Sequence, residues 1–104
     1  MIVYHGSTMI VERPDVKHSY RPLDFGKGFY VTAVKEQAVR WARRKADIEK
    51  CDRAFISMYH SQIWDRDRAL KEIRVYPNYD QTAFVTQTAI DKLLSYDSYE
   101  EVIL

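Results

Sequence analysis

The sequence predicts a single α+β domain over residues 1–104, with a small split antiparallel sheet and flanking helices. Three observations support this prediction. Short runs of β-branched and aromatic residues lie before, between and after segments with helical periodicity. A chain of 104 residues is close to the usual size of one domain and can bury a core. A composition of 46% hydrophobic and 30% charged residues is typical of a globular protein.

The first elements follow from local patterns. Residues 1–5 are apolar and β-prone, which predicts a first strand that ends at Gly6. Residues 12–24 contain two prolines and scattered charges, so we expect a loop or at most a short helix there. After two closely spaced glycines, residues 29–32 are predicted to form a short second strand.

The longest predicted element is a helix over residues 33–50, with Thr32 as its N-terminal cap. Apolar residues recur along it at helical spacing and predict a buried stripe. The stripe consists of Val34, Ala38, Trp41, Ala42 and Ile48.

The second half of the chain gives weaker patterns. Residues 54–59 fit either a strand or the start of a helix, and a strand is favoured. The remaining predictions are a helix over 65–73, a turn at 77–78, a strand over 82–86, a helix over 88–94 and a last strand over 99–104.

Charge and cysteine content restrict the function classes. The formal net charge is +1, which argues against a protein that binds nucleic acid mainly by charge. The basic run at 43–45 is followed by two acidic residues and is interpreted as a solvated helix face. Cys51 is the only cysteine, so no internal disulfide can form. We expect no metal site, because the histidines are far apart in the sequence: His5, His18 and His60.

No segment of the sequence predicts a membrane association. The first residues lack the charged and long apolar regions of a signal peptide, and no apolar run approaches about 18 residues. These features predict a soluble cytoplasmic protein with no membrane partner.

Two short motifs carry the functional information: Tyr4-His5-Gly6-Ser7 and Phe25-Gly26-Lys27-Gly28-Phe29-Tyr30. Each has a structural alternative, since a histidine at a strand end, a Gly-x-Gly turn and a buried tyrosine are common. In this order, the pair resembles the NAD-binding half of ADP-ribosyltransferases of the histidine-tyrosine-glutamate class, which have an NAD site like that of poly-ADP-ribose polymerases. The closest resemblance is to small bacterial members, several of which belong to a family of unknown function.

The resemblance implies a role for each motif residue. His5 would donate hydrogen bonds to ribose hydroxyls, Gly6 would bind the nicotinamide carboxamide through its backbone, and Ser7 would add a hydroxyl to the site. Tyr30 would stack on the nicotinamide ring. Trp41 is the candidate to cover the second face of that ring, but its helical spacing with Val34 and Ala38 favours core packing.

The third element of the class is a glutamate on a late strand, and here Gln81 stands at the matching position. An amide can position a ribose hydroxyl, but it supplies no negative charge to a developing cation. Asp80 is adjacent, but it would point to the other face of a regular strand. A second departure is that only about thirty residues separate the long helix from this strand, fewer than in the known relatives.

The resemblance therefore predicts an NAD-binding mono-ADP-ribosyltransferase-like protein, a toxin or an effector of a phage or mobile element, with NAD as substrate. His5 and Gln81 would be its catalytic residues. The acceptor, whether protein, nucleic acid or small molecule, stays open, as does an antitoxin or a second copy as partner. The alternative is a catalytically degenerate module that binds NAD, ADP-ribose or a protein.

Overall fold

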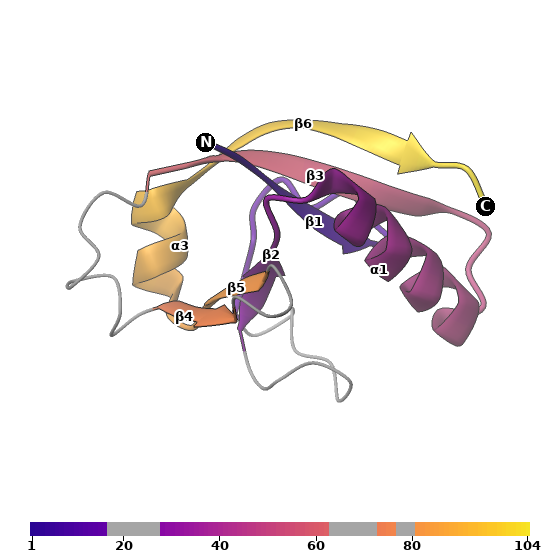
Figure 1. Cartoon of the computed structure of the whole chain (residues 1–104), viewed down its shortest axis with the longest axis horizontal. Helices are drawn as coiled ribbons and strands as arrows, with labels where there is room; N and C mark the ends of the chain where they lie inside the picture. The colour runs from indigo at the N-terminus through magenta and orange to yellow at the C-terminus, as the bar shows by residue number, and fades with distance from the viewer. Residues whose placement is uncertain (17–27, 63–72, 77–80) are drawn as a thin grey trace.

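The structure is a computed structural model, and it describes residues 1–16, 28–62, 73–76 and 81–104 (Figure 1). These residues form strands and two helices in an order that agrees with the predicted α+β class. The elements are β1 (Ile2–Ser7), β2 (Phe29–Val31), α1 (Lys35–Glu49), β3 (Ala54–Ser61), β4 (Ile73–Tyr76), β5 (Gln81–Phe84), α3 (Gln87–Leu93) and β6 (Leu94–Val102).

The strands form two antiparallel sheets of three strands each. Sheet A has the order β1-β3-β6, and sheet B has the order β2-β5-β4. The two sheets meet where β1 approaches the end of β2, through a bridge between Tyr4 and Thr32. The predicted antiparallel architecture with flanking helices is confirmed at this level.

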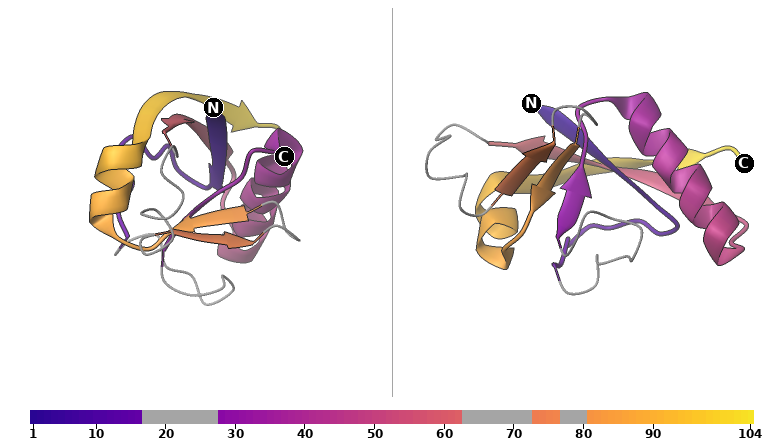
Figure 2. Two further views of the ribbon diagram at one scale, coloured as in Figure 1. Left: turned by 60° about the vertical axis from the view of Figure 1, so that its left-hand side comes forward. Right: turned by 60° about the horizontal axis from the view of Figure 1, so that its bottom comes forward.

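Helix α1 covers one face of sheet A, and sheet B lies against the other face (Figures 1 and 2). Side chains alternate along β1, so Tyr4 and Gly6 face α1 while Val3 and His5 face sheet B. One apolar cluster fills the space between the two sheets and α3. It contains Val3, Val16, Phe29, Val31, Tyr59, Phe84, Ala89, Ile90 and Leu94.

A second apolar cluster lies between α1 and sheet A. Its helix side is the small-residue stripe Ala38, Ala42 and Ala46, and its sheet side is Ala54, Ile56 and Val102. Small side chains allow the helix backbone to lie close to the strands. This packing positions the start of α1 next to β1.

The predicted helix differs from α1 in its buried stripe and its cap. Ile48 is 53% exposed, because it follows Ala46 by two residues and so points to the opposite side of the helix. The N-cap is Val34, which forms no side-chain cap. Thr32 lies two residues earlier, where its hydroxyl accepts a hydrogen bond from the Val34 N–H.

In the second half, residues 54–59 form a strand as favoured, within β3. The predicted helix over 65–73 is wrong at its last residue, since Ile73 begins β4; residues 65–72 and the turn at 77–78 lie outside the described part. Thr86 was predicted to end a strand, but it caps α3 instead. Its hydroxyl accepts a hydrogen bond from the Ala89 N–H.

Strand β6 begins at Leu94, five residues before the predicted start, directly at the end of α3. A register shift opposite Met58 and Tyr59 interrupts the alternation along the pair β3–β6 and so hides the strand pattern. Neither helix of the described residues is long and apolar enough to cross a membrane.

Candidate functional site

The two sequence motifs meet at the junction of the sheets. Tyr4 and Thr32 exchange two backbone hydrogen bonds, with N···O distances of 2.7 and 2.9 Å. One residue further along β1, the His5 ring nitrogen Nδ1 lies 2.7 Å from the backbone oxygen of Tyr30. The structure therefore joins the His-Gly-Ser strand to the strand that follows Gly-x-Gly through a side-chain–backbone bond.

The His5 ring is held on two sides. It is 6% exposed and stacks on Phe29, with ring centroids 4.2 Å apart and an angle of 27° between the planes. Phe29 in turn meets the Tyr59 ring edge to face at 5.6 Å. Packing thus sets the orientation of the imidazole within the core between the sheets.

This geometry restricts the hydrogen bonds that His5 can offer a ligand. A carbonyl oxygen only accepts, so Nδ1 must carry the proton that it donates to Tyr30. In the neutral ring, Nε2 is then an acceptor. The expected donation from His5 to ribose hydroxyls requires the protonated ring, whereas a neutral His5 would accept from a ribose hydroxyl.

Gly6 has a packing reason to be glycine. A Cβ placed there would lie 2.1 Å from the backbone oxygen of Ala38 and 2.8 Å from the backbone nitrogen of Ala42. Both atoms belong to the α1 backbone, which cannot move aside without moving the helix. The absent side chain therefore makes room for α1, and any carboxamide contact would use the Gly6 backbone alone.

Tyr30 and Gln81 share one face of sheet B. Tyr30 is directly opposite Ala83, and Gln81 precedes Ala83 by two residues, so all three side chains point to the same side. Phe29 and Phe84 point to the opposite side, into the core between the sheets. Tyr30 is 5% exposed and Gln81 is 8% exposed.

The predicted site residues are therefore brought together in two groups. Tyr30 and Gln81 lie on the outer face of sheet B, while the His5 ring contacts β2 from the side of Phe29 and reaches Tyr30 through its backbone. Ser7 is buried on the face of β1 that also carries His5. Asp80, the alternative to Gln81, lies outside the described residues.

Trp41 lies on α1, one residue before the buried Ala42. It is partly exposed and belongs to neither of the two apolar clusters of the described residues. Core packing, the structural alternative for this residue, thus accounts for only part of its surface. The indole of Trp41 therefore keeps part of its aromatic surface exposed on α1.

Several residues at the junction were missed by sequence reasoning. The segment 8–16, called the strap, crosses the inner face of sheet A, where the Val11 N–H donates to Ser57 Oγ and the Tyr59 hydroxyl donates to the Val11 oxygen. Burial raises the pKa of the Tyr59 phenol, which keeps it protonated as a donor. Only Phe29 had a sequence signal, as the aromatic residue next to Tyr30.

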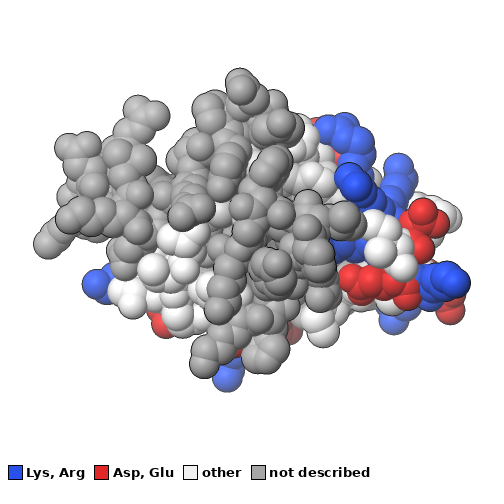
Figure 3. All heavy atoms as spheres, turned by 90° about the horizontal axis from the view of Figure 1, so that it is seen from below, with Lys and Arg blue, Asp and Glu red and all other residues white. Residues whose placement is uncertain are grey.

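Charged side chains of both signs lie side by side on part of the described surface. Basic and acidic side chains are interspersed at the end of the molecule formed by α1 (Figure 3). Arg43 and Arg44 are exposed, as expected of a solvated helix face. Among residues 1–16, 28–62, 73–76 and 81–104, no group of three acidic, histidine or cysteine side chains is placed to hold a metal ion.

Fold and site together define a small α+β protein whose two antiparallel sheets meet at a buried histidine, with a tyrosine and a glutamine on the outer face of the second sheet. Residues 1–60 match the family described as protein of unknown function (DUF3990). Since this match spans more than half of the chain, the protein belongs to that family. No curated protein and no solved structure matches the chain.

Proposed function

We propose that this protein binds NAD on the outer face of sheet B and is of the ADP-ribosyltransferase type. The observation that carries the proposal is the pair Tyr30 and Gln81, two buried polar side chains on the same face, opposite the apolar core. Burying an amide costs free energy unless it is hydrogen-bonded, and a ligand that bonds to Gln81 would offset that cost. The resemblance of the two motifs to the histidine-tyrosine-glutamate class supplies the ligand.

In the proposed complex, the nicotinamide ring stacks on Tyr30 and the adjoining ribose is oriented by Gln81. His5 acts as a positioning residue, because its Nδ1–H holds the backbone oxygen of Tyr30. Since Tyr30 is only 5% exposed, stacking requires its ring to become accessible when NAD binds. Trp41 is the candidate for the second face of the nicotinamide.

The proposed reaction is transfer of one ADP-ribose unit. The bond between ribose C1′ and the nicotinamide nitrogen breaks, and its electron pair leaves with nicotinamide. The ribose becomes oxocarbenium-like, and an acceptor nucleophile attacks C1′ and loses its proton. Gln81 orients the ribose without contributing charge, so this chain would catalyse the step slowly. The proposal leaves the acceptor open. It also includes an antitoxin or a second copy of the chain as partner, and the cytoplasm as location.

Gln81 favours a second candidate function, that of a binder without turnover. An uncharged amide holds a ribose hydroxyl but neither stabilises the developing cation nor accepts a proton. A degenerate member that retains NAD or ADP-ribose would need no more than this.

The variant Gln81→Glu separates the two functions. A carboxylate beside the developing cation should raise nicotinamide release from NAD, recovering part of the roughly two to three orders of magnitude that one such group contributes elsewhere. The assay should run near pH 8, because burial at this position raises the pKa of a carboxyl group. Gln62→Glu makes the same chemical change at an exposed residue and should leave the rate unchanged.

The outcomes distinguish the functions. Faster release by Gln81→Glu supports the transferase site, and bound NAD with no release from either protein supports the binder. If the wild type is active and Gln81→Glu is slower, Gln81 is itself the adapted catalytic residue. A folded protein that never binds NAD overturns the proposal.

A further inference from the structure

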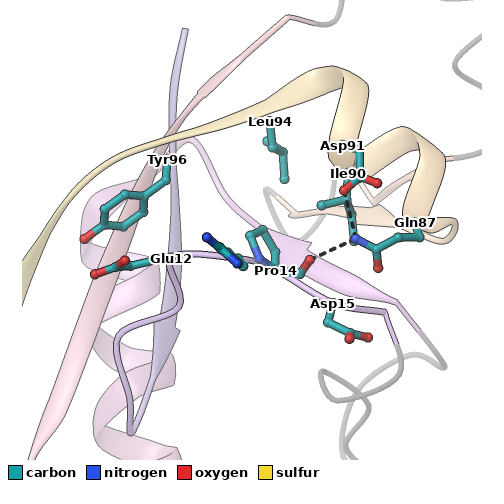
Figure 4. Close-up of a pocket in the computed structure, with 9 residues that line it drawn as sticks. Glu12, Pro14, Asp15, Gln87, Ile90, Asp91, Leu94 and Tyr96 are labelled. Carbon is teal, nitrogen blue, oxygen red and sulfur yellow. Dashed lines mark hydrogen bonds between the residues drawn. The ribbon is translucent and has the colours of Figure 1, made fainter.

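A cavity of about 390 Å³ lies between the strap and the segment formed by α3 and the start of β6 (Figure 4). Its apolar surface comes from Ile90 and Leu94, which are 2% and 9% exposed, and from Pro14. Ile90 and Leu94 belong to the core between the sheets. The cavity therefore lies on the core side of sheet B, away from the face that carries Tyr30 and Gln81.

The charged groups around this cavity are mostly acidic. Among the described residues that line it, three are acidic, Glu12, Asp15 and Asp91, and one is basic, Arg13. This acidic excess favours a cationic group and disfavours an anion.

One wall of the cavity is braced by Gln87. Its amide nitrogen donates to the backbone oxygen of Pro14 at 3.1 Å and to Asp91 Oδ1 at 2.9 Å, as the dashed lines in Figure 4 show. Its amide oxygen accepts from the Val16 N–H. These bonds tie the strap to α3, so the acidic rim and the apolar floor keep their relative positions. Asp91 retains further acceptor sites on its carboxylate.

The other wall is aromatic. Tyr96 lines the cavity next to Glu12, and Figure 4 shows its phenol close to the Glu12 carboxylate. Loss of hydration is the main cause that raises the pKa of Tyr96, and the negative charge of Glu12 adds to it. Glu12 and the Tyr96 ring are thus near enough to act on one bound group.

We propose that this cavity binds an arginine side chain of a partner protein. The methylene stem would lie on Pro14 and Leu94, and the guanidinium would reach the carboxylates. A planar guanidinium binds carboxylates through paired N–H groups and also stacks on an aromatic face, which a lysine ammonium does not do. The positive charge of a guanidinium complements the acidic lining, and this is why an arginine is proposed as the occupant. The site is separate from the proposed NAD face and goes beyond the proposed function.

The test is an NMR titration of the whole chain with the peptide acetyl-Gly-Arg-Gly-amide. We expect saturable shifts of the Ile90 and Leu94 methyl signals and of the Tyr96 ring signals. The isosteric citrulline peptide, which lacks the charge, should give no saturable shift, and the lysine peptide should bind more weakly. Glu12→Gln should lower the arginine affinity about two- to five-fold, the size expected for one exposed charge pair.

Glu101→Gln is the matched control, since it removes one charge from the far end of β6, where Glu101 pairs with Arg53. It should leave the titration unchanged. Equal shifts with the citrulline peptide, equal binding of the lysine peptide, equal effects of the two variants, or no shifts at these three residues would each overturn the proposal. NAD binding is measured separately, so failure here leaves the proposed function untouched.

Discussion

In sheet A the motif residue Gly6 is required by shape, whereas in sheet B the motif residues Tyr30 and Gln81 lie on the face opposite the core between the sheets. Gly6 lies against the α1 backbone, where any Cβ would overlap Ala38. Tyr30 and Gln81 are both more than nine-tenths buried on that face, and burying the amide of Gln81 costs free energy unless it is hydrogen-bonded. A glycine that a helix backbone requires is weak support for a ligand, whereas a buried amide offers a ligand a group to bond. Sheet A therefore acts as scaffold, and sheet B carries the proposed chemistry.

The largest expected effect is on the scaffold. Gly6→Ala places a methyl group 2.1 Å from a helix carbonyl oxygen, so α1 must shift as a body. We expect a loss of more than about 3 kcal/mol in the free energy of unfolding, at the upper end of overpacking effects. Urea denaturation measures it. Gly28→Ala, whose Cβ would meet Phe84 O at 3.2 Å and whose φ of 157° strains an alanine, should still cost less than a direct overlap with the helix backbone. A Gly6→Ala protein as stable as the wild type would contradict the packing account.

The next effect concerns the link between the sheets. His5→Ala removes the bond to the Tyr30 oxygen and the stacking on Phe29. A buried acceptor left without its donor, together with one lost ring contact, should cost about 2–4 kcal/mol of unfolding free energy. His60→Ala removes a histidine from the exposed side of β3, where it pairs with Asp97, and should cost little. Equal losses from the two variants would show that His5 does not join the sheets.

The smallest effect lies at the exposed end of sheet A. Arg53 binds Glu101 through two hydrogen bonds, and this contact lowers the pKa of Glu101 below its ordinary value of 4.5. A carboxyl group with a lowered pKa in the folded state stabilises the fold above that ordinary value, and the contribution is lost as the pH falls through the lowered pKa. Arg53→Gln should therefore destabilise more at pH 7 than at pH 2, where the substitution removes the contact of Arg53 with the Phe55 ring but no ion pair.

Denaturant unfolding of Arg53→Gln at both pH values checks this, with Arg40→Gln as a control, since Arg40 donates on the exposed α1 surface to Gln37, an amide that does not titrate. Because the Arg53–Glu101 pair is solvent-exposed, 0.5 M salt should reduce the difference at pH 7. A difference of the same size at both pH values would show that Arg53 stabilises the chain through its contact with the Phe55 ring and not through Glu101.

Much of the fold could be predicted because its elements follow local patterns. The strand before Gly6, the strand after Gly28 and the long helix were predicted close to their observed bounds. The start of β6 could not be predicted, since a register shift opposite Met58 and Tyr59 breaks the alternation on which a strand prediction depends.

The candidate site could be predicted only in part. Residue types and order predicted that the side chains of His5 and Tyr30 share one cleft, but they lie on opposite sides of β2, and the His5 ring meets the Tyr30 backbone instead. The bond between them uses the Tyr30 backbone, which every residue type possesses, so no sequence pattern could reveal it. The packing of Gly6 on α1 was hidden for a related reason: a glycine required by a helix and one required by a ligand look the same in a sequence.

Titration calorimetry with NAD tests the central claim, that the outer face of sheet B binds this dinucleotide. We predict saturable binding to the wild type, weakened by roughly 1–3 kcal/mol in Tyr30→Leu, the range that aromatic stacking contributes to nucleic-acid bases. Leucine is chosen because Tyr30 is 5% exposed, and alanine would leave a larger cavity. Tyr99→Leu, at a half-exposed tyrosine of β6, should bind NAD like the wild type. No binding by the folded wild type, or equal affinity in Tyr30→Leu, would contradict the claim.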